Sequence, residues 1–406
     1  MTQLASYFKG VSAKLLSAVE VQRSSSNQHE LNGTVAMKGY FGEEKKQFSA
    51  QFIYIGSHDN DRLTLNASVT WYDARAANPA RTEYRLYFSD NNVMSQAAVG
   101  DILITALDKG GNLLMLVVEA MNPLLGAILW WFGLTEKFGD SFVTIDVEAS
   151  TVTSNALFGY IADEVGFEIN DEPDKNWEDW ENKLVNKFGL RFPTTMEFSV
   201  FAQETLAGEI DPIEAPDEAL ISLIDREEML FRTLERKLVG DDLKAKADIL
   251  IENVDAFISF SLSVQNRRKS RAGHALENHL EHIFKKSRVK YSRGKITEGR
   301  SKPDFIFPGQ QKYLDADTPD ELLTMLGVKT SCKDRWRQVL NEAQRIPQKH
   351  LLTLQPSISE HQTTEMRDAD LTLVLPKPLH NTYSAAQQSY LLSLSDFMSV
   401  VIELEG

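Results

Sequence analysis

An aspartate and a lysine mark the ends of two apolar stretches in the C-terminal half of the chain. Asp304 enters the run "DFIFP", and Lys329 ends the run "MLGVK" 25 positions later. If the two runs form adjacent strands, both charged side chains lie at the same edge of a sheet. The carboxylate can then hold a hard Mg²⁺ ion, while the lysine positions or helps deprotonate the water that attacks a phosphodiester. The pair indicates metal-assisted phosphodiester hydrolysis, although an aspartate at such a place is more often a turn or strand-start residue.

This pair resembles the PD-(D/E)xK nuclease pattern, in which a second acid stands two residues before the lysine. That position is Gly327 here. Two other carboxylates are candidates for the missing acid: Glu342 in the segment after the lysine, and Glu277 in an earlier segment. Both segments have the spacing of helices, and an arbitrary helical glutamate is more often a solvent-facing charge. The pattern alone leaves both candidates open.

The elements that must position these residues alternate between helix and strand. Apolar residues recurring at intervals of three and four predict helices over 216–239, 243–262, 272–286, 334–346 and 393–406. Short apolar runs predict strands over 304–308, 325–331, 349–355 and 371–376. The second half of the chain is therefore predicted to be α/β.

The first half has a different pattern. Short β-rich runs separated by turn residues predict strands over 47–56, 62–73, 83–90, 100–108 and 112–120. Strands at this spacing favour a barrel or sandwich over βαβ units. An acidic, tryptophan-bearing stretch over 158–181 shows no clean periodicity. We therefore expect domains over 1–165 and 190–406, with 166–189 as the linker.

Charge is unevenly distributed along the chain. The formal net charge of −15 argues against a nucleic-acid partner. However, residues 265–302 carry twelve Lys and Arg against three Glu, whereas residues 204–255 carry fifteen acids against six bases. A local basic stripe is what a polyanion contacts, although such a run is about as often a solvated helix face. The candidate phosphate contacts in this stripe are Arg267, Arg268, Lys269 and Arg271.

Several classes of protein are disfavoured. Cys332 is the sole cysteine, which excludes a disulfide framework and a cysteine-rich zinc site and fits a reducing cytosol. Three histidines over 274–282 lack the HExxH spacing of a zinc site. The N-terminal stretch has no uninterrupted apolar core and does not read as a signal peptide. The twelve-residue run 123–134 is shorter than the roughly twenty residues of a membrane span and predicts a buried core segment. We expect a cytoplasmic protein without a membrane partner.

Three long motifs give a specific resemblance. The segments "NRRKSRAGHALENHLEHIF" (266–284), "ITEGRSKPDFIFP" (296–308) and "VKTSCKDRWRQVLNEAQRI" (328–346) are similar, in order and spacing, to the catalytic half of EcoRII-like type II (type IIE) restriction endonucleases. In that family the second acid has moved from the strand to the following helix, which accounts for Gly327. The resemblance implies a restriction-endonuclease-like α/β nuclease core, an Mg²⁺ cofactor and an active site of Glu277, Asp304, Lys329 and Glu342.

The resemblance also implies a role for each of these residues. Asp304 is the principal metal ligand, and Glu342 is the relocated acid. Lys329 contacts the scissile phosphate and the nucleophile, and Glu277 is a supporting ligand of the metal or of water. Relatives can flip central bases out of the duplex against an arginine and an aromatic residue, for which Arg226 and Phe231 are a partial match.

The same resemblance implies that Lys333, Asp334 and Arg335 reach base edges in the major groove. Arg and Lys donate to guanine O6 and N7, and a carboxylate accepts from cytosine N4. The triplet is consistent with targets of the CC-centre-GG type, which family members recognise. A capped helix is the alternative, in which Asp334 accepts from backbone amides and the flanking bases are solvated.

The N-terminal half more distantly resembles the B3-like DNA-binding pseudobarrel of the same family. The segment "WYDARAANPARTEYRLYFSDN" (71–91) places Arg75, Arg81 and Arg85 near basic positions of that domain. The resemblance implies an effector module that binds a second copy of the target and restrains the catalytic half until it does. A structural β-domain with scattered surface arginines is the alternative.

Together these features predict a Mg²⁺-dependent, sequence-specific double-stranded DNA endonuclease of a restriction-modification system. A homodimer would supply the two catalytic centres that cutting both strands of a near-symmetric target requires. One alternative is a DNA-binding regulator that has lost catalysis, which loss of any of Asp304, Lys329 or Glu342 would have favoured. Another is a non-specific or repair nuclease, which would not need a base-reading triplet.

Overall fold

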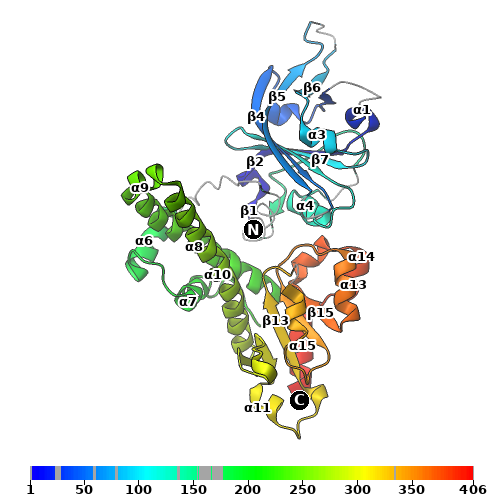
Figure 1. The fold of residues 1–406 in the computed structure, drawn as a ribbon. Coiled ribbons are helices and arrows are strands. Elements are labelled where there is room, and N and C mark those ends of the chain that lie inside the picture. Colours follow the sequence, from blue (N-terminus) through cyan, green and yellow to red (C-terminus); the bar gives the residue numbers. More distant parts are fainter. Residues whose placement is uncertain are drawn as a thin grey trace. The chain divides into compact units, whose positions relative to one another are not determined.

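The computed structural model describes residues 2–22, 29–57, 61–77, 81–134, 138–152, 154, 166, 177–332 and 335–405. The chain divides into two compact units, Met1–Glu172 and Pro173–Gly406 (Figure 1). Within the stretch 166–189, which we expected to be a linker, residues Trp177–Phe188 form helix α6. The C-terminal unit therefore begins with an amphipathic helix that the sequence pattern did not reveal.

The N-terminal unit is built on a sheet of eight strands in the order β3-β6-β5-β4-β8-β7-β2-β9. The paired neighbours run antiparallel, except β4 and β8, which are parallel. The five strands predicted between 47 and 120 are all present, so the strand-rich character of this half is confirmed. The strands are β2 (Phe8–Leu15), β3 (Glu30–Asn32), β4 (Lys46–Ile55), β5 (Arg62–Asp73), β6 (Tyr84–Phe88), β7 (Ile102–Asp108), β8 (Leu113–Val118) and β9 (Val143–Ile145).

Short elements complete this unit. A separate two-stranded ladder pairs β1 with β10. These elements are β1 (Thr2–Gln3), a 3₁₀ turn (Leu4–Ser6), α1 (Ala18–Val21), α2 (Lys38–Phe41), α3 (Asn92–Gln96), α4 (Leu125–Trp131) and β10 (Thr151–Val152).

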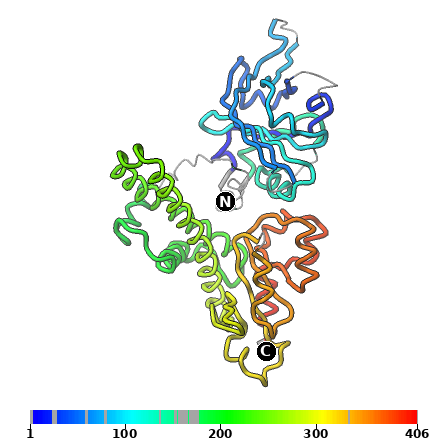
Figure 2. Tube along the Cα trace, in the orientation of Figure 1, coloured from blue at the N-terminus to red at the C-terminus, as the bar shows by residue number. Residues whose placement is uncertain are grey.

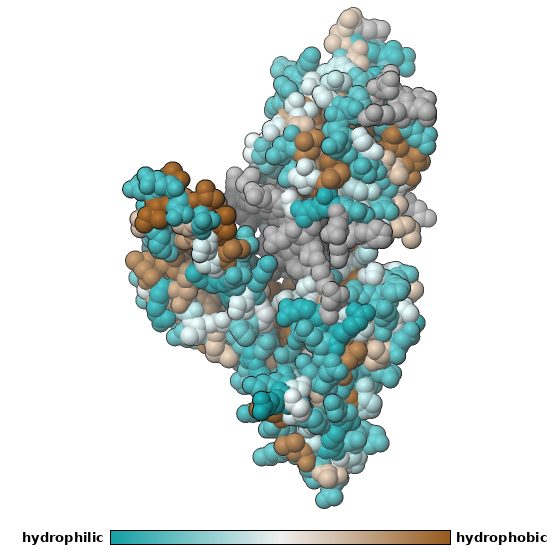
Figure 3. Space-filling view, viewed as in Figure 1, coloured by the Kyte–Doolittle hydropathy of each residue, from teal (hydrophilic) through white to brown (hydrophobic). Residues whose placement is uncertain are grey.

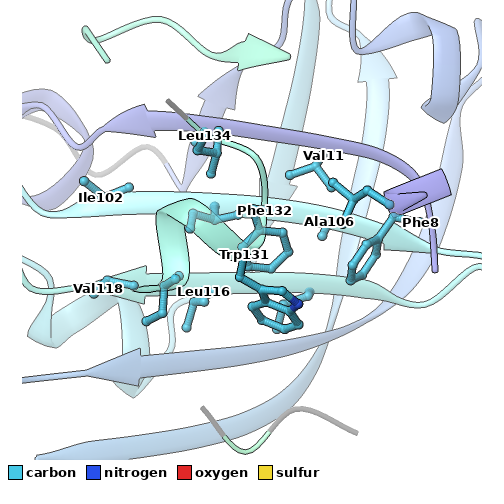
Figure 4. Packing of buried hydrophobic residues seen from close by; sticks show 14 of the residues in the cluster. Phe8, Val11, Ile102, Ala106, Leu116, Val118, Trp131, Phe132 and Leu134 are labelled. Carbon is cyan, nitrogen blue, oxygen red and sulfur yellow. The ribbon is translucent and has the colours of Figure 1, made fainter. Parts of the chain in front are cut away.

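Apolar side chains cover both faces of the eight-stranded sheet. Successive residues of a strand point to opposite faces, and Ile102 and Leu103 on β7 accordingly belong to two different core clusters. Helix α4 covers one of these faces. There Trp131 and Phe132 pack with Phe8, whose ring centroid lies 5.7 Å from that of Phe132 (Figure 4). The apolar run 123–134 is thus a core segment, as predicted.

The C-terminal unit contains a mixed sheet of five strands in the order β11-β12-β13-β14-β15. Strands β11, β12 and β13 are antiparallel, whereas β13, β14 and β15 are parallel. Helices flank this sheet, which confirms the predicted α/β core. The strands are β11 (Ser292–Arg293), β12 (Phe305–Phe307), β13 (Thr324–Lys329), β14 (Lys349–Thr353) and β15 (Leu371–Val374).

The remaining elements of this unit are mostly short. They are the helices α7 (Thr195–Thr205), α11 (Gln310–Leu314), α12 (Trp336–Val339), α13 (Glu360–Asp368), α14 (Ala385–Gln388) and α15 (Leu394–Glu405), with 3₁₀ turns over Glu298–Arg300, Asp320–Leu322 and Lys377–Thr382.

Two long helices, α8 (Pro216–Ala245) and α10 (Val254–Lys286), lie side by side and are joined by the short α9 (Ala247–Glu252) (Figure 2). Pro216 opens α8, where its missing amide proton costs no hydrogen bond. The separate helices predicted over 243–262 and 272–286 are wrong, because the second half of 243–262 and all of 272–286 belong to the continuous α10. No residue between them breaks a helix, and Gly273 is tolerated within one. Among the described residues, no helix is long and apolar enough to cross a bilayer.

Candidate active site

Asp304 and Lys329 meet at one edge of the five-stranded sheet. Strands β12 and β13 are antiparallel, with Phe305 opposite Leu326, so the residue before β12 lies beside the end of β13. One carboxylate oxygen of Asp304, Oδ2, accepts from the Val328 amide at 2.6 Å and from Lys329 Nζ at 3.0 Å. The structure thus brings together the carboxylate and the ammonium that the sequence spacing paired.

Glu342 approaches the same edge from a turn. The helix predicted over 334–346 is present only as the short α12, which ends at Val339, and its predicted extension to residue 346 is wrong, because this stretch consists mostly of turns and bends. Ala343 has a φ of +46°, a left-handed conformation that does not continue a helix. Glu342, the predicted relocated acid, therefore lies on the turn after α12, close enough for the negative charge of Asp304 to raise its pKa.

One oxygen of the Glu342 carboxyl group, Oε2, is buried and has no hydrogen-bond partner among the described residues. Burial, and secondarily the negative charge of Asp304, raise the pKa of Glu342 to about 7, while Lys329 and Lys349 oppose the increase. An unpartnered carboxylate oxygen under the influence of a second carboxylate would be stabilised by a cation.

Gly327 occupies the strand position where the related nuclease pattern has its second acid. A Cβ atom added there would lie 2.9 Å from Cγ2 and 3.1 Å from Cγ1 of Val339 on α12. Real Cβ contacts do not reach 2.9 Å, and Val339 is fully buried. Close packing of α12 on β13 therefore explains why this position has no side chain.

Two carboxylates at this edge suffice for one type of metal site. Across the described ranges no group of three or more His, Cys, Asp or Glu side chains is arranged to hold a metal ion. Mg²⁺, however, usually keeps several waters and takes one or two protein carboxylates together with substrate phosphates. The uncompensated oxygen of Glu342, next to Asp304, fits this donor set, so these two residues are the ones that would hold the ion.

Glu277 is not brought into this group. Its carboxylate accepts from Arg293 Nη2 at 2.9 Å, and the other arm of the same guanidinium donates to Glu281 at 2.7 Å. Glu277 lies on α10, as the sequence predicted, but it is part of an ion-pair cluster with β11. Its predicted function as a supporting metal ligand would require Arg293 to release it.

The predicted base-reading residues are only partly visible. Lys333 and Asp334 lie outside the described residues, so their contacts and the capping of α12 by Asp334 are not addressed by the structure. Arg335 is exposed at the start of α12, and its amide donates to the Cys332 carbonyl at 2.7 Å. The amide of Cys332 in turn donates to Gln355 Oε1 at 2.7 Å. The segment before the triplet is thus held against the segment that follows β14.

The basic stripe over 267–271 is less available than its sequence predicts. The Arg271 side chain is buried and forms ion pairs with Glu227, at 2.9 Å, and with Glu228. Arg268 pairs with Glu235 at 2.7 Å, and Arg267 lies 4.2 Å from the centroid of the Phe192 ring. Arg271 therefore joins α10 to α8 instead of facing a phosphate backbone. Lys269 and Arg268 are exposed, Arg267 is half-buried and Arg271 is buried, and Arg268 is engaged by Glu235, so Lys269 is the most accessible of the four cations.

Residues considered for base flipping and for zinc binding are also structural. Phe231 is buried in a core cluster, and Arg271 lies 4.0 Å from the centroid of its ring. Arg226 donates to the Thr205 carbonyl at 2.9 Å. His279 is fully buried, and its Nε2 lies 2.9 Å from a carboxylate oxygen of Glu227. These contacts place Phe231, Arg271 and His279 in the packing of α8 against α10.

The three N-terminal arginines differ in their contacts. Arg75 and Arg85 both pair with Glu83, and these two hydrogen bonds lower the pKa of Glu83 to about 2. Arg85 also pairs with Glu30 at 2.5 Å across β3 and β6. Arg81 is exposed in the segment before β6. The carboxylates of Glu30 and Glu83 therefore compete with any phosphate for Arg75 and Arg85.

Two cations near the site were missed from the sequence. Lys349 opens the fully buried strand β14 and donates to the carbonyl of Glu342, and Arg293 holds Glu277. A lysine at the start of the apolar run "KHLLT" was a usable signal, because a strand buried on both faces seldom begins with a charge. Arg293 offered no such signal within a run of basic residues.

Comparison with known proteins is consistent with this geometry. Residues 231–398 match the family model for the EcoRII C terminal. The chain is 42% identical over 231 residues to the type II restriction enzyme EcoRII of Escherichia coli. The aligned region covers 56% of this chain and 52% of that protein. This chain therefore spans about half the length of the curated relative.

Two solved structures show weaker likeness. The first is metal-depleted Ecl18kI in complex with uncleaved, modified DNA, with a TM-score of 0.45 and 19% identity over 56% of this chain and 84% of that one. The second is the complex of the restriction endonuclease PspGI with substrate DNA, with a TM-score of 0.44 and 16% identity over 52% of this chain and 93% of that one.

The family-model match spans the region that contains all three predicted motifs. Asp304, Lys329 and Glu342 lie inside it, as do the strands and turns that bring them together. The resemblance inferred from the motifs is confirmed, since residues 231–398 of this chain match the model of the EcoRII C-terminal family.

Proposed function

We propose that this chain is a site-specific deoxyribonuclease that hydrolyses phosphodiester bonds of double-stranded DNA with a divalent metal ion, Mg²⁺ in particular. The observations that support this most directly are the ion pair of Asp304 and Lys329 and the nearby Glu342, whose buried Oε2 has no hydrogen-bond partner among the described residues. A site that held no cation would have no use for this repulsive pair of acids. The match of the surrounding residues to the EcoRII C-terminal family supports the same assignment.

Each residue of the site has a defined task in this proposal. Asp304 and Glu342 would hold the metal ion, which when bound supplies positive charge to the scissile phosphate and to the attacking water. Lys329 directs its ammonium to the same place and stabilises negative charge that develops on the phosphate oxygens. Oδ2 of Asp304 is oriented by the Val328 amide and by Lys329. The other carboxylate oxygen of Asp304, Oδ1, accepts no hydrogen bond from the described residues and is thereby available to the ion.

Sequence specificity is proposed to come from the residues that follow Lys329. Arg335 is exposed only six residues after the catalytic lysine, and Lys333 and Asp334 immediately precede it. Arg and Lys recognise guanine and Asp recognises cytosine, which favours a target of the CC-centre-GG type. The buried Phe231 is not positioned to stack on a flipped base, so base flipping is not included in the proposal.

The N-terminal unit is proposed to be a B3-like effector domain that binds a second copy of the target. Its mostly β architecture and the exposed Arg81 are compatible with this role. Arg75 and Arg85 would contact DNA only after exchange of their carboxylate partners. Binding of the second copy would stimulate cleavage by the C-terminal unit.

A homodimer is proposed from the exposed apolar surface at the end of the α8–α10 hairpin. Apolar side chains that would normally be buried are about half or more exposed there, and Figure 3 shows an apolar patch over this end of the hairpin. Exposed apolar patches of this kind mark interaction sites. A two-fold axis through this patch would bury the same apolar side chains of both copies against each other. The apolar residues are Ile249, Ile251, Val254, Phe257, Ile258 and Leu262.

Plasmid digestion tests the proposed activity. The full chain is incubated with unmethylated plasmids that carry one or two CC-centre-GG sites, with Mg²⁺ or with a chelator. We expect cleavage only with Mg²⁺, and faster cleavage of the two-site plasmid. Asp304→Ala is expected to lower the rate about a thousandfold, or roughly 4 kcal/mol of transition-state stabilisation, while specific DNA binding is retained.

Asp317→Ala is the matched control, because this aspartate is exposed in a loop of the same unit. It is expected to cleave like the wild type. Specific binding without cleavage by the wild-type chain would contradict the enzymatic proposal and would favour a catalytically inactive DNA-binding regulator. Cleavage without sequence preference would favour a non-specific nuclease.

A further inference from the structure

Lys349 is a buried lysine without a carboxylate partner among the described residues. It is the first residue of β14, and only 5% of its surface is exposed. Its Nζ atom lies 2.6 Å from each of three backbone carbonyl oxygens, those of Glu342, Ala343 and Ile346. An ammonium has three donors, so all of them are used within a single turn of the chain.

This turn is the one that carries the relocated acid. The backbone after α12 reverses through Ala343, whose left-handed conformation is unfavourable for a residue with a side chain. Such a conformation persists where the surroundings over-determine it. The amides of Glu342 and Ile346 donate within the turn, to Val339 and Ala343 respectively. Lys349 donates to the carbonyls of Glu342 and Ile346, and it shares the carbonyl of Ala343 with the Ile346 amide.

Burying this ammonium is costly. Burial lowers the pKa of Lys349, and Glu298 and Glu342 oppose the shift. An apolar side chain at this position would suit the other residues of β14, which are all buried. Carbonyl dipoles compensate a buried charge less completely than a hydrogen-bonded carboxylate does. A residue that only filled this position would not need a charge. The function of the ammonium therefore lies in its hydrogen bonds to the turn.

We propose that Lys349 is a positioning residue of the metal site, whose three hydrogen bonds fix the backbone of Glu342 so that its carboxylate stays beside Asp304. This inference rests on the proposed function, because it takes Glu342 and Asp304 as the residues that hold the ion. Lys349 touches neither substrate nor metal. Residues that orient metal ligands in this way typically change metal affinity by about 10- to 100-fold when they are replaced.

Binding of Mn²⁺ to the full chain without DNA tests the proposal. Free Mn²⁺ is measured by its EPR signal during a titration, and the site is defined as the binding that Glu342→Gln removes. Lys349→Met, which keeps the length of the side chain but has no donors, is expected to raise the half-saturating Mn²⁺ concentration at least about tenfold. Lys349→Gln, whose amide reaches fewer carbonyls, is expected to raise it about threefold or more, and it decides the question if the Met variant does not fold.

A matched control separates positioning from general destabilisation. Leu379 is fully buried in the same unit, in a 3₁₀ turn remote in sequence from the site, and Leu379→Ala is expected to lower the melting temperature without changing Mn²⁺ affinity. Wild-type Mn²⁺ affinity in a folded Lys349 variant, or an equal loss in Leu379→Ala, overturns the inference. If the wild type itself shows no Mn²⁺ binding that depends on Glu342, the proposed function fails instead.

Discussion

The pKa of Glu342 is strongly raised at the site. Burial and Asp304 raise its pKa from 4.5 to about 7, so in the metal-free protein near neutral pH its carboxyl group is only partly ionised. An enzyme that binds a cation here must displace the remaining proton. The proposed metal binding would therefore be coupled to pH through this one side chain.

The first prediction concerns stability at the residue scale. Because the folded-state pKa of Glu342 lies above the unfolded value, the folded protein binds more protons between about pH 4.5 and 7, and stability falls as the pH rises through this window. Glu342→Gln removes the ionisable group. With a chelator present, it should stabilise the protein at pH 8 by ~1–2 kcal/mol after discounting for partial exposure.

Calorimetric unfolding at pH 5 and pH 8 measures this effect. At pH 5 the wild-type side chain is neutral, so the variant and the wild type should unfold at the same temperature. Glu321→Gln, an exposed glutamate of the same unit, should show no difference at either pH. Equal stability of Glu342→Gln and wild type at pH 8 would show that the site holds no repulsive charge.

At the scale of elements, the packing of α10 on α8 depends on charge as well as on apolar contact. Arg271 joins the buried Glu227 and the half-buried Glu228 of α8. Burial by itself would raise the pKa of Glu228, but the positive charges of Arg271 and Arg232 outweigh it and lower that pKa. This network fixes the helix that also bears Glu277.

Removing the arginine tests this link. Arg271→Met leaves two carboxylates without their counter-ion and should destabilise the C-terminal unit by about 3 kcal/mol, measured by urea unfolding. Lys269→Ala, two residues away and exposed, should leave stability unchanged and weaken DNA binding at low salt. A fully stable Arg271→Met protein with weakened DNA binding would restore Arg271 as a phosphate contact.

The apolar end of the hairpin gives a further prediction. Replacing Ile251 and Phe257, which are 81% and 51% exposed, by Asp introduces charges into the proposed two-fold interface. Sedimentation velocity should show a dimer for the wild type and a monomer for the double variant, with unchanged helical content. A wild-type chain that sediments as a monomer at micromolar concentration contradicts the homodimer.

Particular residues show which parts could be predicted from the sequence. The pairing of Asp304 with Lys329 was accessible, because apolar runs that begin or end in a charge define strand edges. The end of the helix at Val339 was not, since the turn at Ala343 accepts hydrogen bonds from the Lys349 side chain, a contact that periodicity does not report. Likewise, Arg271 has the sequence environment of a surface cation, and only the packing of α8 reveals it as buried.

At the scale of the whole molecule, a chain with a net charge of −15 is proposed to bind a polyanion. The C-terminal unit contains both the strongly acidic stretch 204–255 and the basic stretch 265–302. Ion pairs between α8 and α10 neutralise part of each stretch. DNA binding then depends on the few cations that these pairs leave accessible, and its salt dependence should be correspondingly shallow.

The division into two units predicts separable activities. A fragment of residues 173–406 should cleave a one-site plasmid as fast as a two-site plasmid, because the proposed effector domain is absent. The full chain should cleave the one-site plasmid more slowly than this fragment. Initial rates on supercoiled plasmids measure both comparisons.

The full chain with Arg81→Ala is the companion variant, since Arg81 is the exposed arginine of the three in the N-terminal unit. It should lose stimulation by the second site while keeping the slow cleavage of the first. A fragment that still requires two sites would place the stimulation within the C-terminal unit.

The contact between Gly327 and Val339 also limits where this site can carry its second acid. A substitution that adds an acid at 327 pushes α12 away from β13, and with it the turn that carries Glu342. The acid gained on the strand therefore comes with displacement of the acid on the turn. In this chain, Val339, which takes no part in the proposed chemistry, thus keeps an acid off the strand position and leaves that role to the turn.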